Sequence, residues 1–174
     1  MFNASASHRL QPSLLDRLAD DTRNERTGVD EHRVMSKAQL RQVVLRDLSA
    51  LFNAVQPLGG LADGYPLLAD SVLNYGLPPL SGQLASKLDV NLLERMIRQA
   101  IVRYEPRILP ETLHVRALEA SSVMDTHNVV EFEIRGHLWA QPVPMEILLR
   151  TQLDLEAGQV EVRDAAASAI AKRE

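Results

Sequence analysis

The chain has 174 residues and a formal net charge of −4, and 45% of its residues are apolar but only 4% are aromatic. A chain of this length can bury about 70% of the surface that its unfolded form exposes, which is enough for one domain with a mainly aliphatic core. The absence of cysteine excludes a disulfide scaffold, a thiolate nucleophile and a cysteine-ligated metal centre, and the interleaved charges give no bulk attraction to nucleic acid.

Residues 1–35 predict an N-terminal arm that contains one short docking helix. A proline–serine pair, typical of a helix start, precedes a short apolar run, and a dense stretch of charged residues follows it. The side chains expected to dock on a partner are Leu14, Leu15, Asp16 and Leu18. A mobile, solvated leader without a partner is the alternative for this arm.

No stretch of the chain resembles a targeting segment or a membrane span. The N-terminal residues lack the run of about 7–15 apolar residues that a signal peptide needs. No span approaches the roughly 20 apolar residues of a membrane helix. We therefore expect a cytoplasmic protein that reaches a membrane only when a partner carries it there.

Two amphipathic helices are predicted in the first two thirds of the chain. One begins after Ser36, a plausible N-cap, and shows apolar residues at three- and four-residue spacing as far as Asn53. The other begins after Asp89 and has the clearest apolar stripe in the chain. Its predicted stripe consists of Leu92, Leu93, Met96, Ile97, Ala100, Ile101 and Tyr104. Between the two helices, residues 66–76 predict a packed corner that ends at Gly76.

After Pro110 the apolar period changes from 3.6 residues to two, which indicates strands. Gly158 predicts a tight turn before the last of them. The result is an α+β fold, with N-terminal helices packed on a C-terminal antiparallel sheet of about four strands. The predicted single domain spans residues 36–163, and residues 164–174 predict a flexible tail. The four strands are expected at residues 113–120, 129–140, 145–155 and 159–163.

Catalysis has little support in the sequence. No phosphate-binding glycine motif or nucleophile elbow is present, and the five histidines show no metal-ligand spacing. Carboxylates are abundant, so a glycosidase that uses two acids stays open as an alternative. We expect no catalytic residue, no metal site and no cofactor.

Tyr104-Glu105-Pro106-Arg107 combines residues with distinct physical roles. Pro106 biases Glu105 away from the helical region and ends the helix. Arg107 follows in an extended segment, where a fixed guanidinium lies close to a fixed carboxylate. This arrangement suits bidentate pairing, either between Glu105 and Arg107 or across an interface with a partner. Local chemistry alone leaves both interpretations open.

Four segments together resemble a known family. In chain order they are Pro12-Ser13-Leu14-Leu15-Asp16-Arg17-Leu18, Arg46-Asp47-Leu48-Ser49-Ala50-Leu51-Phe52-Asn53, Asp70-Ser71-Val72-Leu73-Asn74-Tyr75-Gly76-Leu77-Pro78 and Tyr104-Glu105-Pro106-Arg107. They are similar to the TssE family of type VI secretion baseplate subunits, which is related to the baseplate wedge protein of contractile-tailed phages. The similarity spans roughly residues 12–163, and the order and spacing of the segments are specific.

The resemblance implies a structural wedge subunit that links the baseplate to the contractile sheath and helps to initiate sheath assembly. It implies sheath binding by Glu105, Pro106 and Arg107, and a sheet edge that accepts a strand from a sheath subunit. The implied partners are the wedge subunits TssK, TssF and TssG and the sheath subunits TssB and TssC. Nucleic acid and direct membrane insertion are not expected, and the implied location is a baseplate docked at the inner membrane. A regulatory adaptor and a lysozyme-like glycoside hydrolase are the alternatives on this fold.

Overall fold

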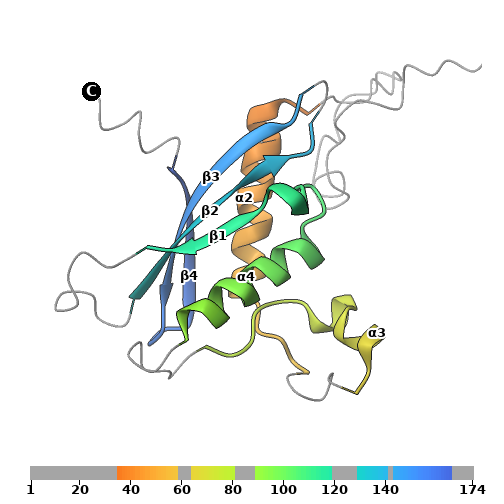
Figure 1. The fold of residues 1–174 in the computed structure, drawn as a ribbon, viewed down its shortest axis with the longest axis vertical. Helices are drawn as coiled ribbons and strands as arrows, with labels where there is room; N and C mark the ends of the chain where they lie inside the picture. Colours follow the sequence, from red (N-terminus) through yellow and green to blue (C-terminus); the bar gives the residue numbers. More distant parts are fainter. Residues whose placement is uncertain (1–34, 59–63, 81–88, 119–128, 141–142, 166–174) are drawn as a thin grey trace, which may run out of the picture.

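The helices come first along the chain and the sheet follows, as Figure 1 shows. Helices α2 (Lys37–Asn53) and α4 (Val90–Tyr104) pack on one side of a four-stranded antiparallel sheet. The predicted α+β fold is therefore confirmed. The computed structural model describes residues 35–58, 64–80, 89–118, 129–140 and 143–165.

Helix α2 begins where its capping residues predict. Ser36 Oγ accepts a hydrogen bond from the Gln39 N–H at 3.2 Å, and Gln39 Oε1 accepts one from the Ser36 N–H at 2.8 Å. A serine cap of this kind stabilises a helix by about 1 kcal/mol. The buried face of α2 consists of Leu40, Val44, Leu48, Leu51 and Phe52.

Helix α4 is capped by Asp89, whose side chain accepts the Leu92 N–H at 3.1 Å. The helix ends at Tyr104, and its C-cap is Glu105, the residue before Pro106, so the predicted stop is correct. The predicted apolar stripe is correct at Leu93, Ile97, Ala100 and Ile101, which are buried. It is wrong at Leu92, which is 47% exposed, because one step along a helix rotates a side chain by about 100° and off the buried face.

The segment between the two long helices contains the short helices α3 (Pro66–Ala69) and η3 (Val72–Asn74). Gly76 ends it with φ +121°, and a Cβ at this position would lie 2.3 Å from the Ala54 carbonyl oxygen. Only glycine permits this close approach, which the hydrogen bond from Leu77 N–H to Ala54 O at 2.9 Å maintains. The predicted stop at Gly76 is confirmed.

The sheet has the strand order β1-β2-β3-β4, and each neighbouring pair is antiparallel. Gly158, with φ +66°, lies in the turn before the last strand, as predicted. The first strand is shorter than expected, and residues 119–120 of its predicted range lie outside the described residues. The strands are β1 (His114–Ala117), β2 (Val129–Leu138), β3 (Met145–Asp154) and β4 (Gln159–Asp164).

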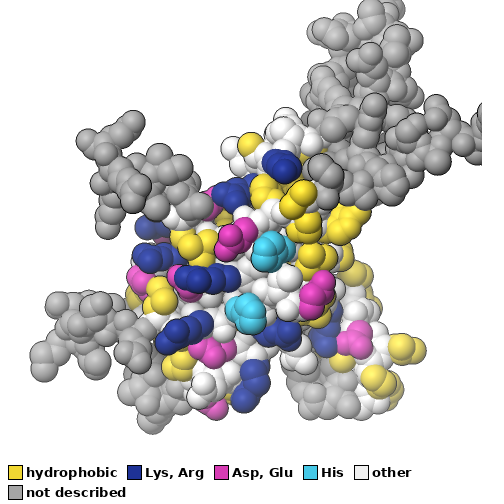
Figure 2. All heavy atoms as spheres, turned by 45° about the horizontal axis from the view of Figure 1, so that its top comes forward, with side chains coloured by type: hydrophobic (Ala, Val, Ile, Leu, Met, Phe, Trp, Pro, Cys, Tyr) yellow, Lys and Arg dark blue, Asp and Glu magenta, His cyan; other side chains and the backbone are white. Residues whose placement is uncertain are grey.

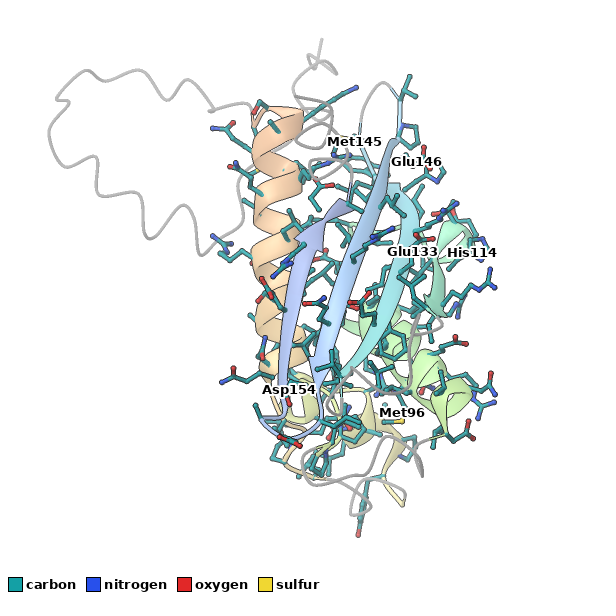
Figure 3. All side chains as sticks on the ribbon, turned by 90° about the vertical axis from the view of Figure 1, so that its left-hand side faces the viewer. Met96, His114, Glu133, Met145, Glu146 and Asp154 are labelled. Atoms are coloured by element: carbon teal, nitrogen blue, oxygen red, sulfur yellow. The ribbon has the colours of Figure 1, made fainter. Side chains whose placement is uncertain are left out.

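The core lies between the two long helices and the inner face of the sheet. Phe132, Ile134, Ile147 and Leu149 are among its fully buried side chains, and they alternate along β2 and β3 with residues of the opposite face, which include Glu133 but also Leu148. We call that opposite, helix-free face the outer face. Figure 3 looks onto it, with Glu133 near its middle and His114 on β1.

Candidate interaction site

The helix stop at the end of α4 is the centre of an ion-pair cluster. Arg107 Nε donates to Glu105 Oε1 at 2.6 Å, and a terminal nitrogen of Arg107 donates to Glu105 Oε2 and, at 2.6 Å, to Asp47 Oδ2. Glu105 is 3% exposed, whereas the side chains of Arg107 and Asp47 are 27% and 30% exposed. The internal salt bridge is therefore present, and Asp47 joins α2 to it.

Pro106 turns the chain so that the residues after it join the sheet. The Arg107 carbonyl accepts the Trp139 N–H at 2.7 Å, and the Leu109 N–H donates to the His137 carbonyl at 2.9 Å. These bonds flank an antiparallel bridge that extends the β1 side of β2. The Arg107 guanidinium is thereby held where the two long helices meet the sheet.

The cluster changes the ionisation of two side chains. Burial of the guanidinium lowers the pKa of Arg107, but its hydrogen bonds to Glu105 and Asp47 outweigh burial and raise this pKa above its usual range. Burial, followed by the nearby carboxylates of Asp47 and Glu105, raises the pKa of Tyr75. Arg107 therefore keeps its positive charge, and ionisation of Tyr75 requires more alkaline solution than usual.

A cavity of ≈ 290 Å³ opens beside this cluster. Its wall combines the ion-pair cluster with apolar side chains from the start of α2 and the end of α4. Pro106, which is exposed, and the accessible part of Arg107 are the atoms of the motif that a partner can contact directly. The lining residues are Met35, Leu40, Asp47, Tyr104, Glu105, Pro106 and Arg107.

The last two residues of α4 hold the loop that contains α3 and η3. Arg103 pairs with Asp70 at 2.6 Å. Tyr104 Oη lies 3.1 Å from the Ser71 carbonyl oxygen and 2.7 Å from that of Asn74. The helix stop therefore fixes two structures at once, the ion-pair cluster on one side and this loop on the other.

The loop exposes large apolar side chains, which we call the apolar platform: Tyr65, Leu67, Val72 and Leu73. Their exposed fractions range from 65% to 89%. Apolar side chains project at the corner of the molecule where α3 lies (Figure 2, lower right). Folding does not bury this surface, although polar contacts from α4 hold its backbone. The predicted packed corner is therefore right for its backbone and wrong for its side chains.

The two edges of the sheet differ in how their backbone groups are bonded. At β1, Glu94 Oε1 of α4 accepts the outward Ala117 N–H at 2.7 Å. At β4, the Asn53 amide bonds both outward groups of Val160, at 2.8 and 3.0 Å. Two residues further on, the outward groups of Val162 are bonded by none of the described residues. On β1, the outward groups of Val115 are likewise bonded by none of the described residues, so each edge strand keeps open backbone positions.

The structure brings together Glu105, Pro106 and Arg107 at one junction, as the sequence suggested. It adds Asp47 and Tyr75, which sequence reasoning did not assign to this site. Asp47 is 60 residues away from Arg107 along the chain, so no local pattern links the two. The predicted docking residues Leu14, Leu15, Asp16 and Leu18 lie outside the described residues, as do most of the predicted arm and tail.

Within the described ranges, no three or more His, Asp or Glu side chains are grouped so that they could hold a metal ion. The helices of the same ranges include none with the length and apolar character needed to cross a membrane.

Comparison with known proteins gave two matches. The family model described as "Baseplate wedge protein gp25" matches residues 38–143, which is more than half of the chain. A solved chain from "The baseplate complex from the type VI secretion system" matches with 18% sequence identity and a TM-score of 0.42, covering 66% of this chain and 94% of that one. No curated protein matches the chain.

Proposed function

We propose, because the chain belongs to the baseplate wedge protein gp25 family, that it is the structural wedge subunit of a type VI secretion baseplate, a TssE-like protein. In this role it joins the wedge to the contractile sheath and helps to initiate sheath assembly. The family match covers α4, β1, β2 and all of α2 except its first residue, so it includes the Glu105–Arg107 cluster.

The observation that supports an assembly role most directly is the apolar platform. A monomeric protein gains little from holding large apolar side chains in water, whereas an interface needs them. Tyr104 and Arg103 hold the platform backbone in place before any partner arrives. Preorganisation of this kind reduces the entropy lost on binding. We assign the platform to contacts with the other wedge subunits.

Sheath attachment is proposed at Glu105, Pro106 and Arg107. Glu105 is buried, so its role is to orient and neutralise Arg107 rather than to contact the sheath itself. Pro106 and the accessible part of Arg107 present the contact surface next to the open cavity. The internal salt bridge and the attachment site are thus two roles of one cluster.

Strand addition from a sheath subunit is proposed at β4, because it is the longer of the two edge strands and none of the described residues bonds its outward backbone groups at Val162. The proposed wedge partners are TssK, TssF and TssG, and the proposed sheath partners are TssB and TssC. The proposed location is the cytoplasmic side of the inner membrane, where the baseplate docks. Wedge docking by Leu14, Leu15, Asp16 and Leu18 stays a prediction.

A structural role also accounts for the two carboxylates of the cluster better than catalysis does. Glu105 and Asp47 both bond Arg107, so neither carboxylate is placed as a free general acid or nucleophile. We therefore propose that this chain has no glycoside hydrolase activity. A regulatory adaptor would bind one soluble partner, and it would need either the apolar platform or the Arg107 cluster but not both.

Co-purification tests the wedge assignment. The full chain with Leu67→Asp and Val72→Asp is co-expressed with TssF and TssG, and recovery of the complex is compared with that of the wild type. Because two apolar contacts are replaced by charges at an interface core, we expect recovery to fall by about tenfold or more. The thermal midpoint should change little, since both side chains are exposed in the free protein.

A matched double variant controls for added charge. Leu92→Asp and Val143→Asp place two carboxylates at positions that are 47% and 61% exposed but lie outside the platform. This control is expected to co-purify like the wild type. Equal recovery of the platform variant and the control would rule out the platform as a wedge interface.

A further inference from the structure

The outer face of the sheet contains a row of charged residues that crosses all four strands. The strand register places Arg116 of β1 opposite Glu133 of β2, Glu133 opposite Arg150 of β3, and Arg150 opposite Arg163 of β4. We call these four residues the arginine row. Three guanidinium groups and one carboxylate therefore lie side by side across the sheet.

Two carboxylates near the row are bonded to arginines of their own strands, and a third accepts a hydrogen bond from the neighbouring strand. Glu133 accepts from Arg135 at 2.8 Å, and Glu161 pairs with Arg163 at 2.7 Å. Gln152 of β3 donates to Glu131 of β2 at 2.6 Å. Because Glu131, Glu133 and Glu161 are already bonded in this way, none of them pairs with Arg116 or Arg150.

Two arginines of the row have no partner among the described residues. Arg116 and Arg150 are exposed, and neither makes a hydrogen bond or ion pair with a described side chain. They lie on strands β1 and β3, so their Cα atoms are roughly 10 Å apart across the sheet. Arg150 also faces Arg163 directly, and like charges opposite each other on neighbouring strands are unfavourable.

We propose that the arginine row binds an acidic segment of a partner protein, whose carboxylates pair with Arg116 and Arg150. Carboxylate is the ligand that a planar guanidinium matches best in proteins, and two such pairs would also relieve the repulsion between Arg150 and Arg163. This surface lies on the opposite side of the sheet from the α2 and α4 core packing. The proposal does not depend on sheath attachment at Arg107.

Nucleic acid is disfavoured as the occupant. The chain carries a net charge of −4, and the same face presents Glu131, Glu146 and Glu161, which would repel a continuous phosphate backbone. On the face drawn in Figure 2, basic and acidic side chains are interspersed. A short acidic peptide can place its carboxylates at the two free guanidinium groups only.

A fluorescent ten-residue serine peptide with two glutamates three positions apart, which span roughly 10 Å when extended, is added to the full chain at low and at physiological ionic strength and tests the proposal. Fluorescence anisotropy should show binding by the wild type that weakens with salt. Arg116→Gln with Arg150→Gln should weaken it about fivefold or more, which is the loss expected for two surface charge pairs. A single-stranded oligonucleotide of ten thymidines is measured in parallel.

The control replaces two exposed cations elsewhere, Lys37→Gln on α2 with Arg95→Gln on α4, and removes the same net charge. It should bind the peptide almost as well as the wild type. The proposal fails if the wild type does not bind the peptide at low salt, if both double variants weaken binding equally, or if the oligonucleotide binds more tightly than the peptide.

Discussion

At the scale of single residues, the Glu105–Arg107 pair cannot be tested by removing only one partner. Glu105 is 3% exposed, so Arg107→Ala would leave a buried carboxylate without its bidentate ligand. Such a change typically destabilises a fold by about 3–5 kcal/mol, less where water reaches the site. Loss of assembly in that variant would then reflect unfolding. Replacing both charges together, by Glu105→Gln with Arg107→Met, avoids the unpaired charge.

Because of Tyr75, the stability of the folded protein is predicted to depend on pH in alkaline solution. The pKa of Tyr75 is raised in the folded protein by burial and by the carboxylates of Asp47 and Glu105, whereas in the unfolded chain it is about 10. A raised folded pKa means that the unfolded state loses its proton first as pH rises. The contribution to stability is therefore fully present below about pH 10 and is lost as pH rises through the folded pKa.

Urea denaturation between neutral pH and pH 11 measures this effect. Above about pH 10, the free energy of unfolding should fall less steeply for Tyr75→Phe than for the wild type, because the variant has no phenol at this position to ionise. Tyr65→Phe, which removes an exposed hydroxyl group, serves as the control. Identical slopes for the wild type and Tyr75→Phe would contradict the assignment of Tyr75 to the cluster.

At the scale of elements, the sequence predicts where helices and strands begin and end and which apolar period they have. It predicts less well which side chains are buried. Ser36, Asp89, Gly76 and Gly158 act locally, through caps and turns, so their roles can be read from the chain. Exposure depends on what packs against an element, and no local pattern contains that information. The apolar platform was therefore predicted as packed although its side chains are exposed, and Asp47 was not assigned to the cluster.

Gly76 is predicted to fix the platform relative to α2. Gly76→Ala requires a strained backbone at φ +121° and places a Cβ 2.3 Å from the Ala54 carbonyl oxygen, so the loop must move away from Ala54. We expect a loss of about 1–3 kcal/mol in the free energy of unfolding, measured by chemical denaturation. Gly64→Ala is the matched control, since no atom lies within 4 Å of the added Cβ. A Gly76→Ala variant as stable as Gly64→Ala would contradict this role.

At the scale of the whole molecule, the fold places separate surfaces around one helix stop. The loop that contains the platform is bonded to the last turn of α4, and the Arg107 cluster lies directly after that turn. The outer face is on the side of the sheet that the helices do not cover. Family membership establishes the baseplate context. The fold class was predictable from the change of period after Pro110, whereas the arrangement of these surfaces required the packing of both helices on the sheet.

The central claim is that the charges of the Glu105–Arg107 cluster are needed for sheath attachment and not only for folding. Its most direct test is the length and frequency of fluorescently labelled sheaths in cells whose only copy of this subunit contains Glu105→Gln and Arg107→Met. The purified variant should keep a thermal midpoint close to that of the wild type, because neither residue leaves an unpaired buried charge. The account predicts that the variant still joins TssF and TssG but that extended sheaths are absent. Sheaths of normal length and frequency in those cells would contradict it.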